Sequence, residues 1–326
     1  THAPGYHGGD IAARDALLAT RPDPGSDATI TMADWQDIPD SFYEDLARRE
    51  NPIFGETDEE IKAHFEDAKR QAECQSSLFG DLETYCMFIG YPRSGHSLIG
   101  SLLDAHESVA ISHELHAIKF MEAGFSDRQL FALILENAKR SAAISRVWGK
   151  FSYAVPGQWQ GRYKQLTVIG DKKGDGSTGM IGRDFSRLEQ FRRHIPLRHR
   201  YVHVIRNPFD NIATIARNDA EQLGRATKFY FDWHRTNLAI AGAVGSGEII
   251  HLRSEGFIAD PRNELSRLCR FLGVAANEDY LRACSEIVAK KPSKTRHSIK
   301  WPGSLRTTIQ ENIERYDLLR GYVFDD

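Results

Sequence analysis

A buried-strand pattern runs directly into a short loop and then into an amphipathic helix near residue 90. The run TYCMFIG (84–90) is apolar almost throughout, which is typical of a strand buried on both faces. The loop YPRSGHS (91–97) follows, and LIGSLLDAH (98–106) places leucines at helical spacing. A helix N-terminus that follows a tight loop presents backbone N–H groups to an anion. The segment therefore predicts an α/β fold with an anion site at the end of this strand.

The rest of the chain repeats the alternation of short apolar runs with amphipathic stretches. Further strands are predicted at SVAI (108–111), LTVIG (166–170), RYVHVI (200–205) and EIIHL (248–252). Helices are predicted at 95–105, 126–147, 183–193, 208–244 and 261–272. This order predicts βαβ units, and hence a three-layer fold with a parallel sheet flanked by helices. Ligands of such sheets bind beyond the carboxyl ends of the strands.

Charge is distributed unevenly along the 326 residues. The first 80 residues hold 7 Lys and Arg against 17 Asp and Glu, and the other 246 hold 35 against 28. We expect an acidic, partly helical extension over 1–82 and one domain over 83–326. In the extension, Thr57 is a candidate N-cap, and Ile61, Phe65 and Ala68 share a helix face. A basic domain suits an anionic ligand, whereas the lack of a Lys/Arg run disfavours nucleic acid.

The sequence contains no apolar stretch long enough to span a membrane and no recognisable cysteine motif. The longest apolar stretches, such as LFALIL (130–135), are much shorter than the ~20 residues that cross a bilayer. We therefore expect no membrane span. The four cysteines, Cys74, Cys86, Cys269 and Cys284, form no CxxC pair and no zinc spacing. They are expected to be reduced core residues, and the protein is expected to be cytoplasmic.

The loop after the first strand resembles a nucleoside-triphosphate loop but lacks its lysine. Gly90, Gly95 and Ser97 fit the frame GxxxxGK[ST], while His96 stands at the lysine position. The nearest cation is Arg93, whose guanidinium can hold an anion with two hydrogen bonds. Without the lysine nothing spans a β/γ-phosphate pair, so a single terminal phosphate is the better-matched ligand.

A second anion site is predicted after the strand at 200–205. Arg206 follows the strand, Pro208 suits a helix start, and Thr214 lies eight residues after the arginine. An arginine and a hydroxyl placed in this way can hold a second phosphate.

Together the two segments resemble the sulfotransferases that use 3′-phosphoadenosine 5′-phosphosulfate (PAPS). Members carry a loop of the form [YV]P[KR]SGTT and a strand that ends in Arg-Asn-Pro, followed by a serine eight residues after the arginine. YPRSGHS and IRNPFDNIAT are similar in order and context. The resemblance covers about residues 83–326 and implies a P-loop NTPase-like sulfotransferase fold. PAPS would be the donor, and PAP (3′-phosphoadenosine 5′-phosphate) the product.

The resemblance also implies ligand roles for individual residues. The implied ligands of the 5′-phosphate are Arg93, Ser94, Gly95, His96 and Ser97, and those of the 3′-phosphate are Arg206 and Thr214. His96 replaces the first threonine of the loop, and Thr214 replaces the usual serine. Leu98 stands where many cytosolic members place an adenine-stacking tryptophan. Tyrosylprotein-type members also have a leucine at this position.

Candidates for the chemistry follow two other strands. LLDAHESVAISHEL is similar, without a gap, to the tyrosylprotein-type segment that presents a glutamate base, which implies Glu114. His113 is the alternative, because cytosolic members use a histidine. Burial is expected to raise the pKa of a glutamate with this role. Lys172 is implied as the lysine that stabilises the leaving phosphate, with Lys173 as the alternative.

Near the C-terminus, KKPSKTRHSIKWPGSL is a basic loop like the one that covers the cofactor in family members. Its SIKWP resembles a tyrosylprotein-type IKP motif and implies Lys300, with Ser293, Lys294 and Arg296 as further candidates. RSEGF (253–257) lacks the tyrosine of the adenine-contacting stretch in the family, so no adenine residue is assigned.

Two alternatives remain open at this level. Asp171 ends an apolar run and could serve a P-loop kinase or ATPase as a Mg²⁺ ligand, although the neighbouring Lys172 and Lys173 would repel a metal. A non-catalytic nucleotide-binding module would use the same loops. If the protein is a sulfotransferase, no metal ion is expected in its site. The acceptor, whether small molecule, glycan, lipid or peptide, and the oligomeric state do not follow from the sequence.

Overall fold

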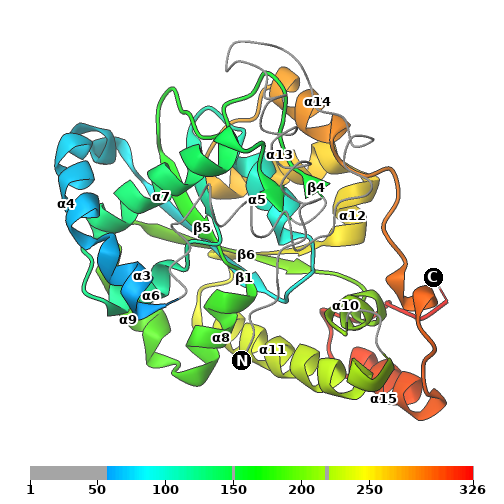
Figure 1. Ribbon diagram of the computed structural model, residues 1–326. Helices are drawn as coiled ribbons and strands as arrows, with labels where there is room; N and C mark the ends of the chain where they lie inside the picture. Colours follow the sequence, from blue (N-terminus) through cyan, green and yellow to red (C-terminus); the bar gives the residue numbers. More distant parts are fainter. Residues whose placement is uncertain (1–56, 149–150, 217–219, 326) are drawn as a thin grey trace, which may run out of the picture. The chain divides into compact units, whose positions relative to one another are not determined.

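A five-stranded parallel sheet forms the centre of the protein (Figure 1). The computed structural model describes residues 57–148, 151–216 and 220–325. The strands are β1 (Thr84–Gly90), β2 (Val109–His113), β5 (Val168–Lys172), β6 (Arg198–Ile205) and β7 (Ile249–Arg253), in the order β2-β5-β1-β6-β7. All five predicted strands are confirmed to within three residues at either end. A short antiparallel pair, β3 (Val147–Trp148) and β4 (Phe151–Ser152), stands apart from the sheet.

Helices cover both faces of the sheet, which makes three layers. They are α3 (Asp58–Ala63), α4 (Phe65–Cys74), α5 (His96–Asp104), α6 (Ala117–Glu122), α7 (Asp127–Ala143), α8 (Asp175–Arg183), α9 (Ser186–His194), α10 (Pro208–Ile215), α11 (Leu223–Ala243), α12 (Ser254–Ala259), α13 (Pro261–Leu272), α14 (Glu278–Glu286) and α15 (Gly303–Arg315). Short 3₁₀ turns are η2 (Ser76–Asp81), η3 (Ala220–Gln222) and η4 (Thr295–Ser298). The predicted three-layer α/β fold is confirmed.

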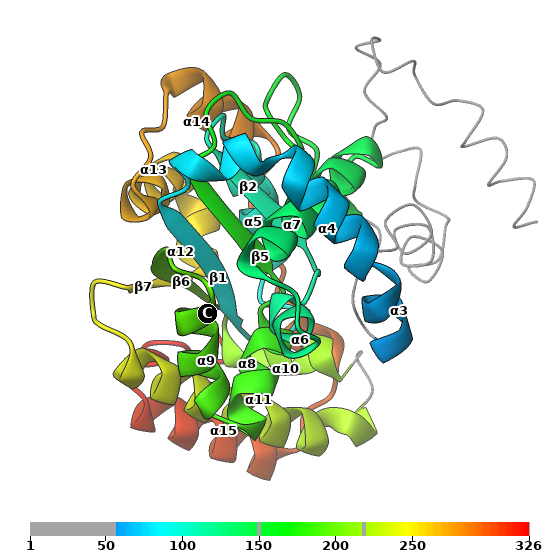
Figure 2. The same ribbon diagram turned by 90° about the vertical axis from the view of Figure 1, so that its left-hand side faces the viewer.

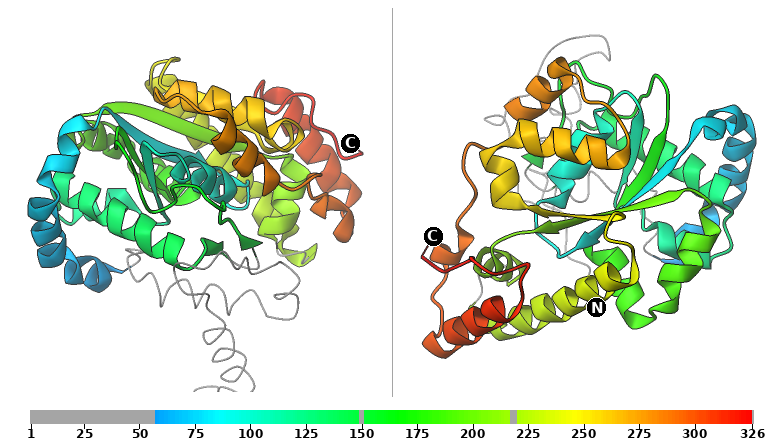
Figure 3. Two further views of the ribbon diagram at one scale, coloured as in Figure 1. Left: turned by 90° about the horizontal axis from the view of Figure 1, so that it is seen from above. Right: turned by 180° about the vertical axis from the view of Figure 1, so that it is seen from behind.

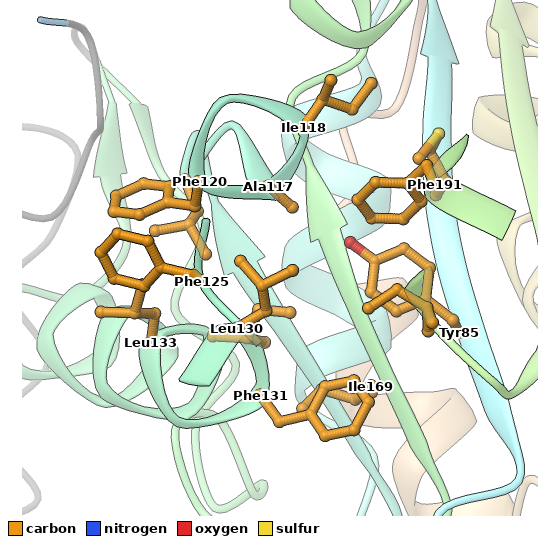
Figure 4. Close-up of a cluster of buried hydrophobic side chains, with 14 of the residues drawn as sticks. Tyr85, Ala117, Ile118, Phe120, Phe125, Leu130, Phe131, Leu133, Ile169 and Phe191 are labelled. Atoms are coloured by element: carbon orange, nitrogen blue, oxygen red, sulfur yellow. The ribbon is translucent and has the colours of Figure 1, made fainter. Parts of the chain in front are cut away.

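Side chains of β1 alternate between two hydrophobic cores, as the period of a strand requires. Tyr85 and Met87 join a cluster with residues of α4, α6, α7, α8 and α9, part of which is drawn in Figure 4. Cys86 and Phe88 join a second cluster with α5, α12, α13 and α14. A third cluster unites α10, α11 and α15, which lie together in Figure 3. Because both faces of β1 are covered, its near-continuous apolar sequence is explained.

The described part of the predicted extension packs against the domain. Helix α4 lies beside α7 (Figure 2), and Ile61 and Ala68 are buried in the first core cluster. Thr57 is the predicted cap: its Oγ1 accepts from the Glu60 N–H at 3.2 Å, and the Glu60 carboxylate accepts from the Thr57 N–H at 2.8 Å. The boundary between 82 and 83 stays a prediction, and residues 1–56 lie outside the described residues.

Some predictions of elements were wrong. The stretch 208–244 is not one helix but α10 and α11 with η3 before α11, and α8 was not predicted. Cys74 is exposed, so it is not a core residue, whereas the other three cysteines are buried and all four are free thiols. Among the described residues, no helix is both long and apolar enough to cross a membrane.

Candidate active site

The candidate site residues lie at the carboxyl edge of the sheet, where four neighbouring strands end. The loop after β1, Glu114 after β2, Lys172 at the end of β5 and Arg206 after β6 all meet this edge. Parallel strands deliver their C-terminal residues to one edge, so Arg93 and Arg206, 113 residues apart in sequence, are brought into contact.

The loop after β1 adopts backbone conformations that suit anion binding. Gly90 has φ 142°, and a Cβ there would approach the Val204 carbonyl oxygen to 3.2 Å. Gly95 has φ 98° and caps the N-terminus of α5, and Arg93 also has a positive φ of 63°. Such a sequence of conformations turns successive N–H groups toward one point at a helix N-terminus. These conformations are compatible with an anion nest, and Arg93 lies within the loop.

Arg206 connects the two predicted phosphate sites. Its guanidinium donates to the Thr214 hydroxyl at 3.3 Å and to the carbonyl oxygen of Arg93 at 3.3 Å. It also donates to the Ser293 carbonyl at 2.8 Å and to the Thr295 hydroxyl at 3.2 Å. Thr295 was missed in the sequence, where only its place in the basic C-terminal loop could have suggested it. Two hydroxyls and a guanidinium thus lie beside the first loop.

Lys172 reaches the first loop past a glycine of α5. A Cβ on Gly100 would lie 2.8 Å from Lys172 Cγ, so glycine makes room for this buried side chain. Lys172 Nζ donates to the Ser97 hydroxyl at 3.0 Å and makes an ion pair with Glu114. Lys173 contacts the other oxygen of Glu114 at 3.1 Å. The carboxylate therefore lies between two ammonium groups, of which Lys172 touches the loop.

The electrostatics of Glu114 differ from the expectation. Burial alone would raise the pKa of its carboxyl, but the ammonium groups of Lys172 and Lys173 outweigh burial and hold that pKa well below its usual range. The predicted rise was wrong because the sequence did not reveal that both lysines converge on one carboxylate. Glu114 is therefore ionised at neutral pH and can accept a proton without first losing one.

His113, the alternative base, lies beside Glu114 at the end of β2. Neither of its ring nitrogens has a hydrogen-bond partner among the described residues, and its ring packs edge-on against Trp148 with centroids 4.9 Å apart. Burial, followed by the charge of Lys172, lowers the pKa of His113 well below its ordinary value. Neutral His113 can hydrogen-bond a substrate, so it stays the alternative base.

His96 turns its ring into the site rather than away from it. Its Nδ1 lies 3.1 Å from the Ser94 hydroxyl, and its Nε2 lies 3.9 Å from Glu114. A Cβ on Gly174 would approach the ring to 2.9 Å, so glycine is needed there. Burial lowers the pKa of His96 to about 3, with Lys172 adding to the effect. The ring is therefore neutral.

The C-terminal candidates take different positions. Ser293 contributes its carbonyl to Arg206, and the buried Arg296 makes an ion pair with Asp210 and donates to the Phe324 carbonyl at 2.6 Å. Arg296 thus anchors the loop to α10. Lys300 is exposed, and Leu98 packs at the edge of the second core cluster. Their roles toward a cofactor stay predictions.

Asp171, the candidate magnesium ligand, has both oxygens engaged by protein donors. They accept from the Ser112 hydroxyl at 2.8 Å, from the Leu115 N–H at 3.2 Å and from the Ala117 N–H at 3.0 Å. These bonds take three of the roughly four lone-pair sites of the carboxylate. Among the described residues, no three His, Cys, Asp or Glu side chains cluster as metal ligands would. The arrangement does not favour a kinase or ATPase.

Comparison with known proteins gives one family match, over residues 183–278, to a model described as "Sulfotransferase family". The match covers less than a third of the chain and supports its similarity to the sulfotransferases. The resemblance seen in the sequence is thereby confirmed. The matched stretch contains Arg206 and Thr214 but neither the first loop nor Glu114 and Lys172. No curated protein matches the sequence.

Solved structures with a similar course of the chain include several sulfotransferases. The sulfotransferase domain of an olefin synthase from Synechococcus PCC 7002 is 21% identical, with 73% of this chain and 96% of that one covered and a TM-score of 0.46. STF9 from Mycobacterium avium is 10% identical, with 97% and 98% covered and a TM-score of 0.47. Mouse SULT7A1, solved with PAP, is 10% identical, with 78% and 89% covered and a TM-score of 0.40.

Proposed function

We propose that this protein is a sulfotransferase that uses PAPS as its donor and transfers the sulfuryl group to an acceptor hydroxyl or amine. The observation that supports it most is the contact of Lys172 with both Ser97 of the anion loop and Glu114. One side chain thus joins a site for the donor phosphate to a group that can accept a proton.

The donor set fits PAPS in its chemistry. The loop amides, Arg93, Ser97 and Lys172 would hold the 5′-phosphate end, and Arg206, Thr214 and Thr295 the 3′-phosphate. Guanidinium groups and hydroxyls suit terminal phosphates, because they match the tetrahedral oxygens without a metal. When bound, PAPS supplies a sulfuryl group that is activated by its link to a phosphate.

Each residue then has a separate task. Glu114 accepts the proton of the acceptor as the acceptor attacks sulfur in line with the leaving oxygen. Lys172 turns its ammonium toward the oxygen that the sulfuryl group leaves, while Lys173 keeps the carboxylate ionised. The loop amides and Arg93 stabilise the negative charge that grows on the phosphate. Burial of Lys172 and Glu114 keeps water from competing with the acceptor.

PAP should stabilise the purified protein without any metal. A ligand at 100 times its Kd adds about 2.7 kcal/mol to the free energy of unfolding, which raises Tm by several degrees. We expect this rise in a thermal-shift titration with PAP and EDTA, and little rise with ATP and Mg²⁺. The reverse pattern would contradict the proposal in favour of a kinase or ATPase.

Transfer itself is tested with ³⁵S-labelled PAPS and a panel that contains a phenol, a sugar, an aliphatic alcohol and an amine. The ³⁵S label should be transferred to at least one of these four classes of acceptor. Stabilisation by PAP with no labelled product from any acceptor would favour a non-catalytic binding module. The acceptor class and a cytoplasmic location both stay predictions.

Arg206→Ala should weaken PAP binding selectively through the 3′-phosphate. A charge-assisted hydrogen bond contributes roughly 1.5–3 kcal/mol, so the Kd of PAP should rise about 10- to 150-fold. Calorimetry with PAP and with adenosine 5′-monophosphate, which lacks the 3′-phosphate, should show that the variant loses the preference for PAP.

Arg192→Ala is the matched control for this substitution. Arg192 pairs with Glu248 at 2.9 Å, near the amino end of β7 and hence at the opposite edge of the sheet. Its loss should leave the Kd of PAP unchanged. If the ratio of the Kd of adenosine 5′-monophosphate to the Kd of PAP were the same in Arg206→Ala as in the unsubstituted protein, the 3′-phosphate assignment would be wrong.

A further inference from the structure

Asp171 is a buried carboxylate whose hydrogen bonds all go to the end of β2, the turn at 114–116 and the first residue of α6. Only 2% of the residue is exposed. Oδ1 accepts from the Ser112 hydroxyl at 2.8 Å and from the Leu115 N–H at 3.2 Å, and Oδ2 accepts from the Ala117 N–H at 3.0 Å. Ser112 precedes Glu114 by two residues, and Leu115 follows it directly. The carboxylate therefore holds the turn that presents the proposed base.

The turn needs stabilising contacts of this kind because its backbone is strained. Glu114 and His116 have φ values of 61° and 70°, in the left-handed region that residues with a Cβ rarely adopt. Strained residues persist only where their surroundings fix them. The Glu114 N–H donates to the Lys172 carbonyl at 3.0 Å, which continues the β2–β5 pairing past the end of β2. On the other side, Ala117 and Ile118 pack in the hydrophobic cluster of Figure 4.

The last two residues of β5 act on opposite faces of the sheet. Successive side chains of a strand point to opposite sides. Asp171 faces the turn before α6, while Lys172 faces α5, where it passes Gly100 and reaches Ser97. The turn brings Glu114 over the end of β5 to Lys172. The proposed base and the leaving-group lysine therefore meet at the end of β5, directly beside Asp171.

We propose that Asp171 is a positioning residue that fixes Glu114 against Lys172, an inference that rests on the proposed function. Two of its three partners are backbone N–H groups, which only an acceptor can satisfy. An asparagine keeps the shape but turns one N–H₂ group toward a backbone N–H, donor against donor. Asp171→Asn therefore tests positioning with little change of volume.

In Asp171→Asn, amide hydrogen exchange should rise at least tenfold in the peptide that spans 112–118, measured by mass spectrometry on the protein without ligand. Exchange in the loop 91–97 and the Kd of PAP should remain unchanged, because Asp171 does not touch the loop. With the best acceptor of the ³⁵S panel, kcat should fall at least 30-fold while the KM for PAPS changes less than threefold.

Asp104→Asn is the matched control. Asp104 is equally buried, accepts from the Ile111 N–H of β2 at 2.8 Å and from the Gly161 N–H at 2.8 Å, and makes a buried ion pair with Arg146, but it does not hold the turn. Asp104→Asn also weakens this ion pair, so it should lower Tm at least as much as Asp171→Asn does. Exchange at 113–117 and kcat should nevertheless stay close to those of the unsubstituted protein. Equal losses of kcat in both variants would reduce Asp171 to a general structural role.

A milder variant guards against failure to fold. Ser112→Ala removes one of the three bonds and should produce a smaller change in the same two measurements. Unchanged exchange over 112–118 in Asp171→Asn and in Ser112→Ala would overturn the inference. Exchange needs no acceptor, so this result stands apart from the proposed function, which fails if the unsubstituted protein transfers no label.

Discussion

Glu114→Gln should abolish most of the transfer activity and leave the donor site intact. A positioned general base contributes about 10²- to 10⁴-fold to the rate, and kcat with ³⁵S-labelled PAPS should fall by that amount. Glutamine is nearly the same size as glutamate but cannot accept the proton. The Tm rise with PAP should persist, because the loop amides, Arg206 and Thr214 are unchanged.

Glu107→Gln is the control for this substitution, and His113→Asn tests the competing assignment. Glu107 precedes β2, is partly exposed and pairs with Lys164 at 3.7 Å, so its loss should change kcat less than twofold. If His113→Asn lost the activity while Glu114→Gln kept it, the histidine would be the base. Losses in both would indicate that neutral His113 orients the acceptor whose proton Glu114 takes.

The pH profile separates a lowered from a raised pKa. A base whose pKa lies well below the ordinary glutamate value of 4.5 stays in its proton-accepting form over the whole neutral range. We therefore expect Glu114 to cause no fall in kcat/KM between about pH 8 and pH 5.5. A carboxyl with a raised pKa would cause a fall in that range. Because folding lowers the pKa of Glu114, its ion pair with the lysines stabilises the fold at pH values above 4.5. This stabilisation is lost as the pH falls from 4.5 through the lowered pKa of the folded state.

The sequence was sufficient to predict the features that depend on local patterns. The five strands of the sheet are apolar runs of strand length, and the loop after β1 is continuous in sequence from Tyr91 to Ser97. The position of Arg206 beside that loop followed from one rule, that parallel strands end at a common edge. For these elements the relevant interactions are set by residues close in the chain or by topology alone.

The features that the sequence did not reveal depend on contacts between distant segments. The lowered pKa of Glu114 arises from two lysines 58 and 59 positions away in sequence, which β5 delivers to the end of β2. Asp171 looked like a metal ligand because its partners, three donors around Glu114, become visible only in the folded chain. Thr295 belongs to a loop whose path is set by the ion pair of Arg296 with Asp210.

Lys172→Ala should reduce kcat about 10²- to 10³-fold, the usual effect of removing one donor that stabilises developing charge. The reason is the place of its ammonium, which already bonds Ser97 of the anion loop at 3.0 Å. Lys172→Arg should not restore the rate, since the larger guanidinium must pass Gly100, where the native lysine leaves no room even for a Cβ. Single-turnover rates with PAPS measure the chemical step directly.

Lys173→Ala is the control that decides between the two lysines. Lys173 contacts Glu114 at 3.1 Å, whereas the bond to Ser97 belongs to Lys172. Loss of the Lys173 ammonium should raise the pKa of Glu114 and shift the acid limb of the pH profile to higher pH. The maximal rate should fall less than it does in Lys172→Ala. Added ethylamine should recover part of the activity of Lys172→Ala, because it can replace the ammonium in the space that the side chain leaves. A larger loss in Lys173→Ala, without recovery by ethylamine in Lys172→Ala, would transfer the leaving-group role to Lys173.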